Sequence, residues 1–381
     1  MYKIFLVVPP GIEPIAFKEV NQLFPHHQIS NRNDDLEFEG DLEMIYKLNL
    51  LLRIPNRILI RFAEFDATRF QDLFNKSVKL SWKQYFKKGV GVSIRTTCHK
   101  SKLYHSDAVS QRIHQAIEAN LSRSVSLQKG NLEEVNPKHQ LLIVRLLRDK
   151  VTISIDTSGN PLYMRGYREI VSKAPIRENL AASLILASGW TPDYPLIDPF
   201  CGSGTIPIEA ALITKNQPPG LYRDFAFESW PGFNQNEWQD IRRSYIDSCT
   251  DSSCKILGSD RDIGSINNAR LNSEKAKVNQ IIEWKNQTIS EVNPFSEIDL
   301  RNEPGWIITN PPYGIRVSTN KDIRNLYAQF GNHLRKYFQN WQVIFLCNSI
   351  VLANQSKLNP KSLLSFSNGG IQVQAFYAKV E

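Results

Sequence analysis

Near residue 310 a carboxamide, two prolines and an aromatic ring follow one another, as Asn310-Pro311-Pro312-Tyr313 directly after the apolar run Trp306–Thr309. Two prolines fix φ and remove two backbone donors, so this segment is expected to form a rigid corner just past a strand end. Amino-directed methylation needs such a corner, because carbonyl acceptors on the two N–H bonds of an exocyclic amine can localise and aim its lone pair. The Tyr313 ring can stack on a base swung out of its helix or loop. The alternative is an ordinary turn.

A second motif runs from a short apolar segment, Leu196-Ile197-Asp198, into a loop that contains Gly202 and Gly204. The apolar residues predict a buried strand, and a helix is expected over Thr205–Thr214. Glycines allow a ligand to approach the backbone, and the free N–H groups at the helix start can meet its polar end. Pro207 replaces the third glycine of the dinucleotide fingerprint, which disfavours NAD. The loop is compatible with the looser Asp-x-x-x-Gly-x-Gly pattern of adenosylmethionine enzymes.

Two carboxylates, Asp260 and Asp262, follow the next predicted strand, Lys255–Gly258. A carboxylate at a strand end can take two hydrogen bonds from a ribose diol, and we assign this role to Asp260. Asp262 is expected to cap the helix that begins at Ile263. The spacing from the glycine loop exceeds the ~20 residues of the compact dinucleotide fold, so an insertion of about 215–253 must leave the sheet.

The elements that would position these motifs differ between the two halves of the chain. The first half predicts a small α+β sandwich, with Asp41 capping one helix, and a second α+β unit that begins near Gly89. In the second half, strands alternate with helices, which predicts a doubly wound parallel sheet. The strands expected before residue 160 are Ile4–Val8, Leu36–Glu39, Ile58–Phe65, Val90–Thr97, Gln140–Leu147 and Lys150–Thr157, and the helices are Pro14–Leu23, Met44–Leu52, Phe70–Tyr85 and Asp107–Leu121. The elements expected later include helices Ile176–Ala187, Ile263–Lys277 and Arg324–Tyr337, strands Ile281–Lys285 and Gln342–Cys347, and a hairpin at Asn368-Gly369.

The excess positive charge is concentrated in the first half of the chain. The 381-residue chain carries a net charge of +8. Residues 1–170 hold 25 Lys+Arg against 18 Asp+Glu, and residues 45–130 hold 16 against 5. A basic half joined to a nearly neutral half indicates a module that binds a polyanion, although solvation of exposed faces is the alternative.

Composition also bears on compartment. The five cysteines form no Cys-x-x-Cys pair, which favours reduced thiols over disulfides or a zinc site. No apolar run reaches the roughly 20 residues of a membrane span, and the N-terminus does not have the pattern of a signal peptide. We therefore expect a cytoplasmic protein.

With these motifs in place, the second half resembles class I S-adenosylmethionine-dependent methyltransferases of the Asn-Pro-Pro-Tyr type. Gly314 after Tyr313, Ala174-Pro-Ile-Arg177-Glu178 and Arg165-Gly-Tyr167-Arg168 narrow the resemblance to the THUMP-domain RNA guanine-N2 methyltransferases, which include bacterial large-subunit rRNA and archaeal tRNA enzymes. The first half is similar to the ferredoxin-like segment and THUMP domain of that family, and Ser101-Lys102-Leu103 fits it. The resemblance implies a ferredoxin-like segment at 1–65, a THUMP RNA-binding domain at 66–165 and a Rossmann-like methyltransferase domain at 166–381. It also implies methyl transfer to N2 of a guanine in 23S rRNA.

The resemblance further implies roles for particular residues. Asn310-Pro311-Pro312-Tyr313 would hold the target base. S-adenosylmethionine would be held by the glycine loop and its neighbours, namely Arg177, Asp198, Phe200, Gly202, Gly204, Thr205, Asp260, Thr288 and Asn310. One position departs from the family, because Asn286-Gln287-Thr288 stands where members carry an Asp that binds the adenine amino group, and an amide or hydroxyl acceptor would have to replace it.

The mechanism expected is direct transfer without metal or covalent intermediate, and Cys201 is taken as a packing residue because it lies outside any cysteine target motif. Three alternatives stay open. A tRNA could be the substrate, the chain could be a DNA adenine-N6 methyltransferase, which shares Asn-Pro-Pro-Tyr, or it could be a non-catalytic RNA-binding protein.

Overall fold

The strands of the computed structural model form two sheets, one in each of two compact units. The structure describes residues 1–27, 30–32, 35–168, 176–250, 254–294, 304–313 and 320–381. Unit 1 comprises Met1–Val8, Val20–Leu162 and Gly220–Ser244. Unit 2 comprises Pro9–Glu19, Tyr163–Pro219 and Tyr245–Glu381. Each unit therefore contains a segment that the order of the sequence would place in the other.

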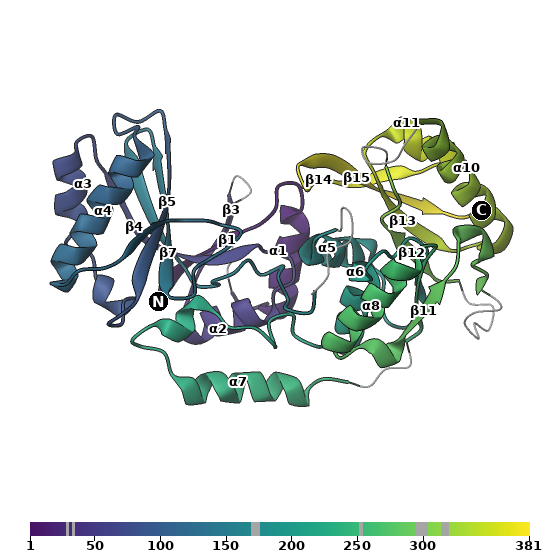
Figure 1. Cartoon of the computed structure of the whole chain (residues 1–381), viewed down its shortest axis with the longest axis horizontal. Coiled ribbons are helices and arrows are strands. Elements are labelled where there is room, and N and C mark those ends of the chain that lie inside the picture. Colours follow the sequence, from purple (N-terminus) through teal and green to yellow (C-terminus); the bar gives the residue numbers. More distant parts are fainter. Residues whose placement is uncertain (28–29, 33–34, 169–175, 251–253, 295–303, 314–319) are drawn as a thin grey trace. The chain divides into compact units, whose positions relative to one another are not determined.

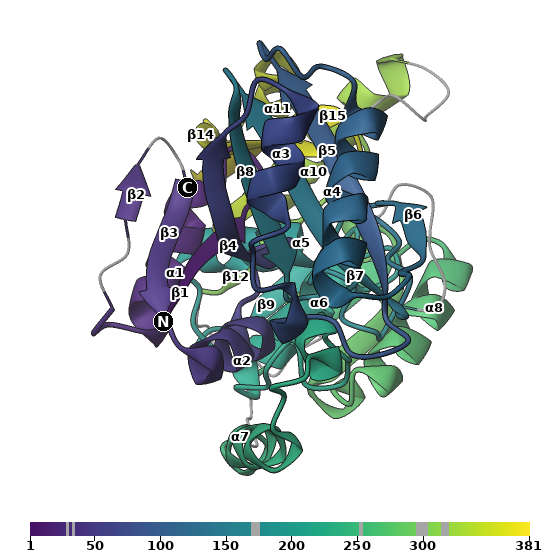
Figure 2. The same ribbon diagram turned by 90° about the vertical axis from the view of Figure 1, so that its left-hand side faces the viewer.

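One eight-stranded sheet runs through unit 1, in the order β2-β3-β1-β4-β8-β7-β5-β6. It therefore continues across Gly89, where the sequence predicts a second α+β unit. Figure 2 shows two helices side by side over one face of this sheet, α3 and α4, and these helices contact each other. The strands are β1 (Tyr2–Val7), β2 (Ser30–Arg32), β3 (Asp35–Gly40), β4 (Arg57–Asp66), β5 (Gly91–His99), β6 (Leu127–Lys129), β7 (His139–Leu147) and β8 (Lys150–Asp156). The helices are α2 (Leu42–Leu51), α3 (Phe70–Ser77), α4 (Ser106–Leu121) and most of α7 (Gln235–Asp247), while α1 (Glu13–Leu23) is divided between the units.

One predicted helix of unit 1, Phe70–Tyr85, was too long. The α-helix ends at Ser77, and Trp82–Gln84 forms a separate 3-10 turn. Side chains donate to carbonyl groups in this stretch, in addition to the amides of the local turns. Asn120 of α4 donates to the carbonyls of Val78 (2.9 Å) and Leu80 (3.1 Å). The indole of Trp82 donates to the Ser77 carbonyl at 2.8 Å, so side chains distant from the helix end it.

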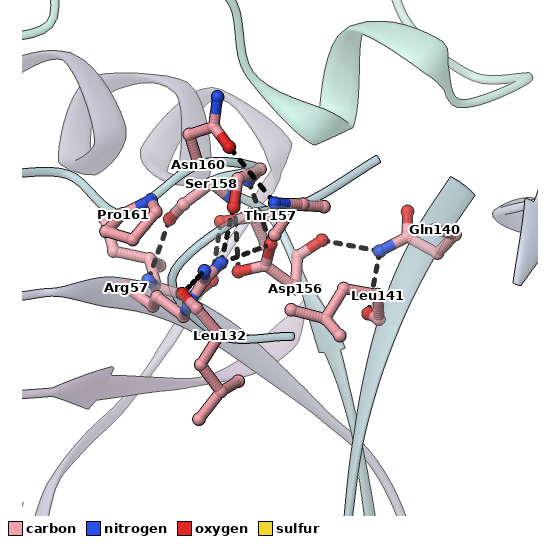
Figure 3. Close-up of polar contacts among 12 residues, drawn as sticks. Arg57, Leu132, Gln140, Leu141, Asp156, Thr157, Ser158, Asn160 and Pro161 are labelled. Carbon is pink, nitrogen blue, oxygen red and sulfur yellow. Dashed lines mark hydrogen bonds and ion pairs between the residues drawn. The ribbon is translucent and has the colours of Figure 1, made fainter. Parts of the chain in front are cut away.

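A buried ion pair joins the middle of unit 1. Arg57, at the start of β4, lies 3.0 Å from Asp156 at the end of β8, and neither side chain is more than 3% exposed. Figure 3 shows the surrounding contacts, in which the Arg57 guanidinium also donates to the carbonyls of Gly159 and Leu132. Burial still raises the pKa of the Asp156 carboxyl, against the lowering effect of Arg57. The turn that follows β8 is therefore part of a polar network.

Residues 220–244 leave the unit 2 sheet, as the length of the insertion predicted, and pack in unit 1. The indole of Trp230 donates to Gln140 Oε1 of β7 at 2.7 Å. The ring of Trp238 lies 5.7 Å from that of Tyr46 in α2 and 5.3 Å from that of Phe227. Aromatic rings buried together in this way contribute both area and edge-to-face attraction, so this segment completes the core of unit 1.

Unit 2 has a seven-stranded sheet in the order β11-β10-β9-β12-β13-β15-β14, with the first five strands parallel. The doubly wound parallel sheet predicted from the sequence is confirmed. Figure 1 shows α6 and α8 near β11 and β12, and α10 and α11 near β13 and β15. Helix α6 contacts β9 and β10, and α8 contacts β10 and β11. The strands are β9 (Leu196–Asp198), β10 (Ile256–Asp260), β11 (Ile282–Asn286), β12 (Trp306–Thr309), β13 (Gln342–Cys347), β14 (Lys361–Asn368) and β15 (Ile371–Lys379). The helices are α5 (Glu178–Ser188), α6 (Thr205–Thr214), α8 (Ile263–Lys275), α10 (Asn320–Tyr337) and α11 (Ile350–Ala353).

One apolar cluster of unit 2 lies between the sheet and α10. Fully buried residues of that helix, Tyr327, Phe330 and Leu334, join alternate residues of the strands, such as Ile307 and Phe345, in one apolar cluster. The segment Pro9–Glu19 also belongs to unit 2. Its backbone approaches β14 so closely that a Cβ at Gly11 would lie 1.9 Å from the Ser365 carbonyl oxygen. Residues near the start of the chain, within Pro9–Glu19, thus pack on a strand that is made near the end of the chain.

Candidate cofactor and target-base site

Most of the predicted site residues lie at or follow the carboxyl ends of β9, β10 and β12, whereas Arg177 precedes α5 and Thr288 follows β11. Because β9 lies between β10 and β12, and the chain moves outward from β9 first on one side and then on the other, this is the switch point of the sheet. Open parallel sheets bind ligands in the crevice at this position. The three strands end at Asp198, Asp260 and Thr309, and Asn310 follows directly.

The glycine loop connects β9 with α6. Gly202 and Gly204 have φ angles of +53° and +86°, a region that suits glycine. A side chain at Gly204 would also place its Cβ 2.6 Å from the Trp284 ring. The loop is anchored by the Cys201 amide, which donates to the Ser259 carbonyl of β10 at 3.0 Å. Thr205 begins α6, whose cap Gly204 makes no side-chain hydrogen bond, so amides at the helix start are available to a ligand.

Asp198 lies beneath the loop. Its side chain is buried, and its Oδ1 accepts hydrogen bonds from the Thr309 hydroxyl at 2.6 Å and from the Phe200 amide at 3.1 Å. Burial raises the pKa of this carboxyl to about 7, and the two hydrogen bonds oppose the rise. Asp198 therefore holds the start of the loop to the end of β12, while Phe200, half-buried, packs on the core cluster.

The carboxylates of Asp260 and Asp262 make different contacts. Asp262 caps α8, because its Oδ2 accepts from the Ser265 amide at 2.9 Å, as the sequence predicted. Asp260 is half-buried beside the glycine loop, where its Oδ2 accepts from the Gly202 amide at 3.0 Å and its Oδ1 from the Asp262 amide at 3.0 Å. Each carboxylate oxygen can accept more than one hydrogen bond, so these contacts orient Asp260 and leave acceptor capacity for a diol.

Thr288 follows β11 in the neighbourhood of Asp260. The amide of the preceding residue, Gln287, donates to the Asp260 carbonyl at 3.1 Å. Thr288 is exposed, and Glu291 Oε2 accepts from its amide (2.6 Å) and from its hydroxyl (2.9 Å). These hydrogen bonds lower the pKa of the Glu291 carboxyl. The prediction from the sequence extended only to Thr288 and did not include Glu291, the acid three residues later. The S/T-x-x-E capping pattern could have indicated that Glu291 contacts Thr288.

Arg168 and Glu178 form a largely buried ion pair near the start of α6. In the sequence, these two residues served only as evidence for the family resemblance. The Arg168 guanidinium donates to the Thr205 hydroxyl at 2.7 Å and to the Ile176 carbonyl at 2.9 Å. It also lies 3.3 Å from Glu178, whose carboxyl has a raised pKa because burial outweighs the effect of Arg168. Arg177, which directly precedes Glu178, places its guanidinium 4.6 Å from the centre of the Tyr163 ring. Ala174 and Pro175 lie outside the described residues.

The Asn-Pro-Pro-Tyr corner follows β12, as predicted from its two prolines. Asn310 Oδ1 is covered from solvent and has no hydrogen-bond partner in the described part of the chain. Pro311 is buried and Pro312 is exposed. Tyr313 is half-buried on the core cluster, and its hydroxyl oxygen accepts a 3.0 Å hydrogen bond from Asn368 Nδ2. Gly314 lies outside the described residues.

The thiol in the glycine loop is not activated. Burial raises the pKa of Cys201 well above its usual value, and the nearby carboxylates Asp198 and Asp260 raise it further. A neutral buried thiol is a poor nucleophile, which agrees with the packing role predicted for it. All five cysteines are free. Within the described ranges, no helix is long and apolar enough to cross a membrane.

These residues fit S-adenosylmethionine. The loop offers backbone amides and close approach, Asp260 offers an acceptor for a ribose diol, and Asn310 Oδ1 is a buried acceptor without a partner among the described residues. An acceptor of this kind costs free energy when it is left unpaired, so its presence at the site suits a hydrogen-bond donor brought by a ligand.

Comparison with known proteins agrees with this geometry. Three family models match: the RlmL ferredoxin-like domain over residues 3–59, the THUMP domain over 67–156, and the RMKL-like methyltransferase domain (UPF0020) over 165–373. YpsC of Bacillus subtilis (strain 168), provisionally named an RNA methyltransferase, is 33% identical over 91% of this chain and 88% of its own length. The ribosomal RNA large subunit methyltransferase K/L of Colwellia psychrerythraea is 32% identical over 96% of this chain. The chain spans 51% of that protein, about half its length.

A solved structure covers the whole chain. SMU.472, provisionally named a methyltransferase and crystallised with S-adenosylhomocysteine (SAH), has a TM-score of 0.86 and 30% identity, and the match covers 100% of this chain and 98% of that one. The fold and the site thus define a class I methyltransferase that depends on S-adenosylmethionine. The chain belongs to the RMKL-like methyltransferase family, with ferredoxin-like and THUMP domains ahead of the methyltransferase domain.

Proposed function

We propose that the protein transfers a methyl group from S-adenosylmethionine to the exocyclic N2 amino group of a guanine in RNA, and that this RNA is 23S rRNA. The coarser part, an RNA methyltransferase of the large-subunit K/L type, follows from the family. The observation that carries the amino-directed chemistry is the unpartnered Oδ1 of Asn310 at the end of β12, within the described part of the chain. An amide oxygen in this position can accept a hydrogen bond from the target amine and localise its lone pair.

The chain's own residues divide the work as follows. The bound cofactor supplies an electrophilic methyl group on a sulfonium. Gly202, Gly204, Phe200 and Thr205 of the loop, with Asp260, Arg177 and Thr288, would hold it, while Asp198 fixes the loop from beneath. Asn310 orients the amine, and the Tyr313 ring stacks on the base, a contact worth ~1–3 kcal/mol per base. Pro311 and Pro312 restrict the distance between Asn310 and the Tyr313 ring, because neither proline can rotate about φ.

The choice of RNA rests on the first half of the chain. THUMP is an RNA-binding domain in the family that the sequence resembles, and residues 45–130 hold most of the excess positive charge. The K/L relatives are named for large-subunit ribosomal RNA, which favours rRNA over tRNA as partner and the cytoplasm as compartment. In this proposal residues 1–65 and 66–165 bind RNA, and 166–381 carries out the transfer.

The test is nucleoside mass spectrometry after incubating the purified protein and labelled S-adenosylmethionine with rRNA, tRNA and DNA from cells that lack the gene. We expect N2-methylguanosine in 23S rRNA. Label in tRNA would show that the substrate is tRNA instead of rRNA, and N6-methyladenine in DNA would refute the proposal. Cofactor binding without transfer to any of the three nucleic acids would indicate a binding protein.

The Asn310→Ala variant tests the mechanism. We expect cofactor affinity to be nearly intact and single-turnover transfer to be slower by at least about a hundredfold, the loss of ~2.7–4 kcal/mol typical for one preorganised polar partner at a reacting centre. Transfer at a rate near that of the unmodified protein would make the corner a structural turn only.

A further inference from the structure

The hairpin at the C-terminal end of the sheet carries a carboxamide that touches the target-base corner. β14 and β15 are joined by Gly369 and Gly370, whose φ angles are +59° and +84°. Positive φ at both central residues defines a type I′ turn, the common two-residue connection in hairpins. The turn predicted at Asn368-Gly369 is therefore one residue further on, and Asn368 is the last residue of β14, paired with Ile371.

This placement frees the Asn368 side chain from the turn. Asparagine next to glycine is ordinarily a turn former, either because it tolerates positive φ or because its side chain binds the local backbone. Here the two glycines supply the positive φ, and Asn368 is only 6% exposed. Its Nδ2 donates instead to the hydroxyl oxygen of Tyr313, 3.0 Å away and 55 positions earlier in the chain. The contact joins two segments that have no neighbouring strands in common, since β12 and β14 are separated by β13 and β15.

The hydrogen bond restrains one particular motion of the ring. The hydroxyl of a tyrosine lies on the line from Cβ through the ring, so a partner at the hydroxyl fixes the direction of that line, which is set by χ1. Packing of the Tyr313 ring against the core cluster restrains rotation about the line. Tyr313 is thus held at both ends, by Pro312 at its backbone and by Asn368 at its tip. A base stacked on this ring would take its position from the same two points.

We propose that Asn368 is a positioning residue for methyl transfer, which acts by holding the Tyr313 ring in the orientation that receives the target base. This inference rests on the proposed function, because it uses Tyr313 as the stacking surface. It assigns the β14–β15 hairpin to the target-base pocket and leaves the cofactor side unaffected. Misplacement of a reacting group by a fraction of an ångström slows the chemical step more than it weakens binding of a long RNA, which is dominated by phosphate contacts.

The test is a double-mutant cycle between Asn368→Ala and Tyr313→Phe, measured by single-turnover transfer to rRNA from cells that lack the gene. Asn368→Ala should slow transfer by about tenfold, as expected when a buried hydrogen bond is removed, with cofactor affinity unchanged and RNA affinity within about twofold. Tyr313→Phe removes the same bond from the other side. In that background Asn368→Ala should change the rate by less than about twofold, because the contact is already absent.

Two further variants separate positioning from folding of the hairpin. In Asn368→Asp the carboxyl oxygen can accept from the Tyr313 hydroxyl, so the rate should return to within about threefold of that of the unmodified protein. Gln372→Ala removes a carboxamide from the same hairpin, where it is exposed and donates to Ser365 at 2.9 Å, and it should have no effect.

The inference is overturned if Asn368→Ala transfers at the normal rate. It is also overturned if the loss is just as large in the Tyr313→Phe background, because Asn368 would then act through the hairpin alone. Asn310→Ala is measured in parallel. Normal transfer by that variant contradicts the proposed function, whereas loss in Asn310→Ala with no loss in Asn368→Ala contradicts only this inference.

Discussion

The hydroxyl of Thr309 donates a 2.6 Å hydrogen bond to Oδ1 of Asp198, and so joins the end of β12 to the end of β9. Thr309 immediately precedes Asn310, and Asp198 opens the glycine loop. One buried bond therefore connects the corner that would orient the target amine with the loop that would hold the cofactor. A disturbance on either side should be measurable on the other.

Thr309→Val keeps the shape of the side chain and removes this bond. Asp198 then loses one of its two partners while it stays buried, which should cost ~1–3 kcal/mol in stability of unit 2. We expect weaker cofactor binding and slower transfer together, measured by calorimetry and single-turnover assays. Thr309→Ser retains the hydroxyl and serves as control. If cofactor affinity in Thr309→Val is normal and only transfer falls, the two sides of the site are independent.

The raised pKa of Asp198 predicts how the stability of unit 2 depends on pH. Since the carboxyl has a pKa of about 7 when folded and ~3.9 when unfolded, the folded chain holds a proton that the unfolded chain has released between about pH 4 and 7. This stabilising contribution is complete below pH 4 and is lost as pH rises to 7. Asp198→Asn cannot ionise, so its stability relative to the unmodified protein should rise by up to about 1.4 kcal/mol per pH unit, and then level off.

Hydrogen exchange of the β9 and β12 amides reports this change for unit 2 alone. A difference between the two proteins that does not vary from pH 5 to 8 would mean that Asp198 ionises as an ordinary carboxyl does.

The neighbouring acids Asp260 and Asp262 form a matched pair for testing cofactor binding. Asp260→Asn keeps the size of the side chain but weakens its acceptor strength toward a diol and toward the Gly202 amide. We expect S-adenosylmethionine affinity to fall at least about tenfold, or ~1.4 kcal/mol. Asp262→Ala should leave affinity unchanged and cost ~1 kcal/mol in stability through loss of the helix cap. The reverse result would transfer the diol contact to Asp262.

Lys83, Lys87 and Lys88 are exposed in unit 1, within the segment of highest positive charge. Replacing all three with Ala should weaken RNA binding and lower the slope of log affinity against log salt by ~0.7–0.9 for each phosphate that is no longer neutralised. Filter binding from 50 to 200 mM salt measures both. Lys361→Ala with Lys379→Ala removes two exposed charges from unit 2 and should leave the slope nearly unchanged. An unchanged slope in the triple variant would place the RNA on another surface.

Local patterns predicted much of unit 2 and one helix cap of unit 1. The boundaries of α6, β12 and β13 coincide with those inferred from apolar runs and caps, and the caps at Asp41 and Asp262 are confirmed. These features depend on residues only a few positions apart. The glycine loop and Asp260 were each predicted to follow a strand and to hold the cofactor, and in the structure the Gly202 amide donates to Asp260 Oδ2 at 3.0 Å.

Long-range contacts could not be inferred in this way. Nothing near Asn368 indicates Tyr313 as its partner, and nothing near Trp238 indicates Tyr46. The helix predicted over Phe70–Tyr85 failed for the same reason, since Asn120 of another helix binds the carbonyls that would have continued it. A single sequence carries periodicity and capping signals, whereas such pairings are decided when the whole chain packs.

The exchange of segments between the two units has a consequence during synthesis. Unit 1 lacks Trp238 and Phe227 until the ribosome has passed residue 244, and unit 2 contains Pro9–Glu19, which must wait for β14 near the end of the chain. Unit 1 therefore cannot close its core before residue 244 is made, and unit 2 cannot pack its N-terminal segment before β14 is made, although domains usually fold in the order of their translation. The nascent chain therefore exposes apolar surface of unit 1 until residue 244 has been made, and a ribosome stalled before that residue would release two incomplete units together.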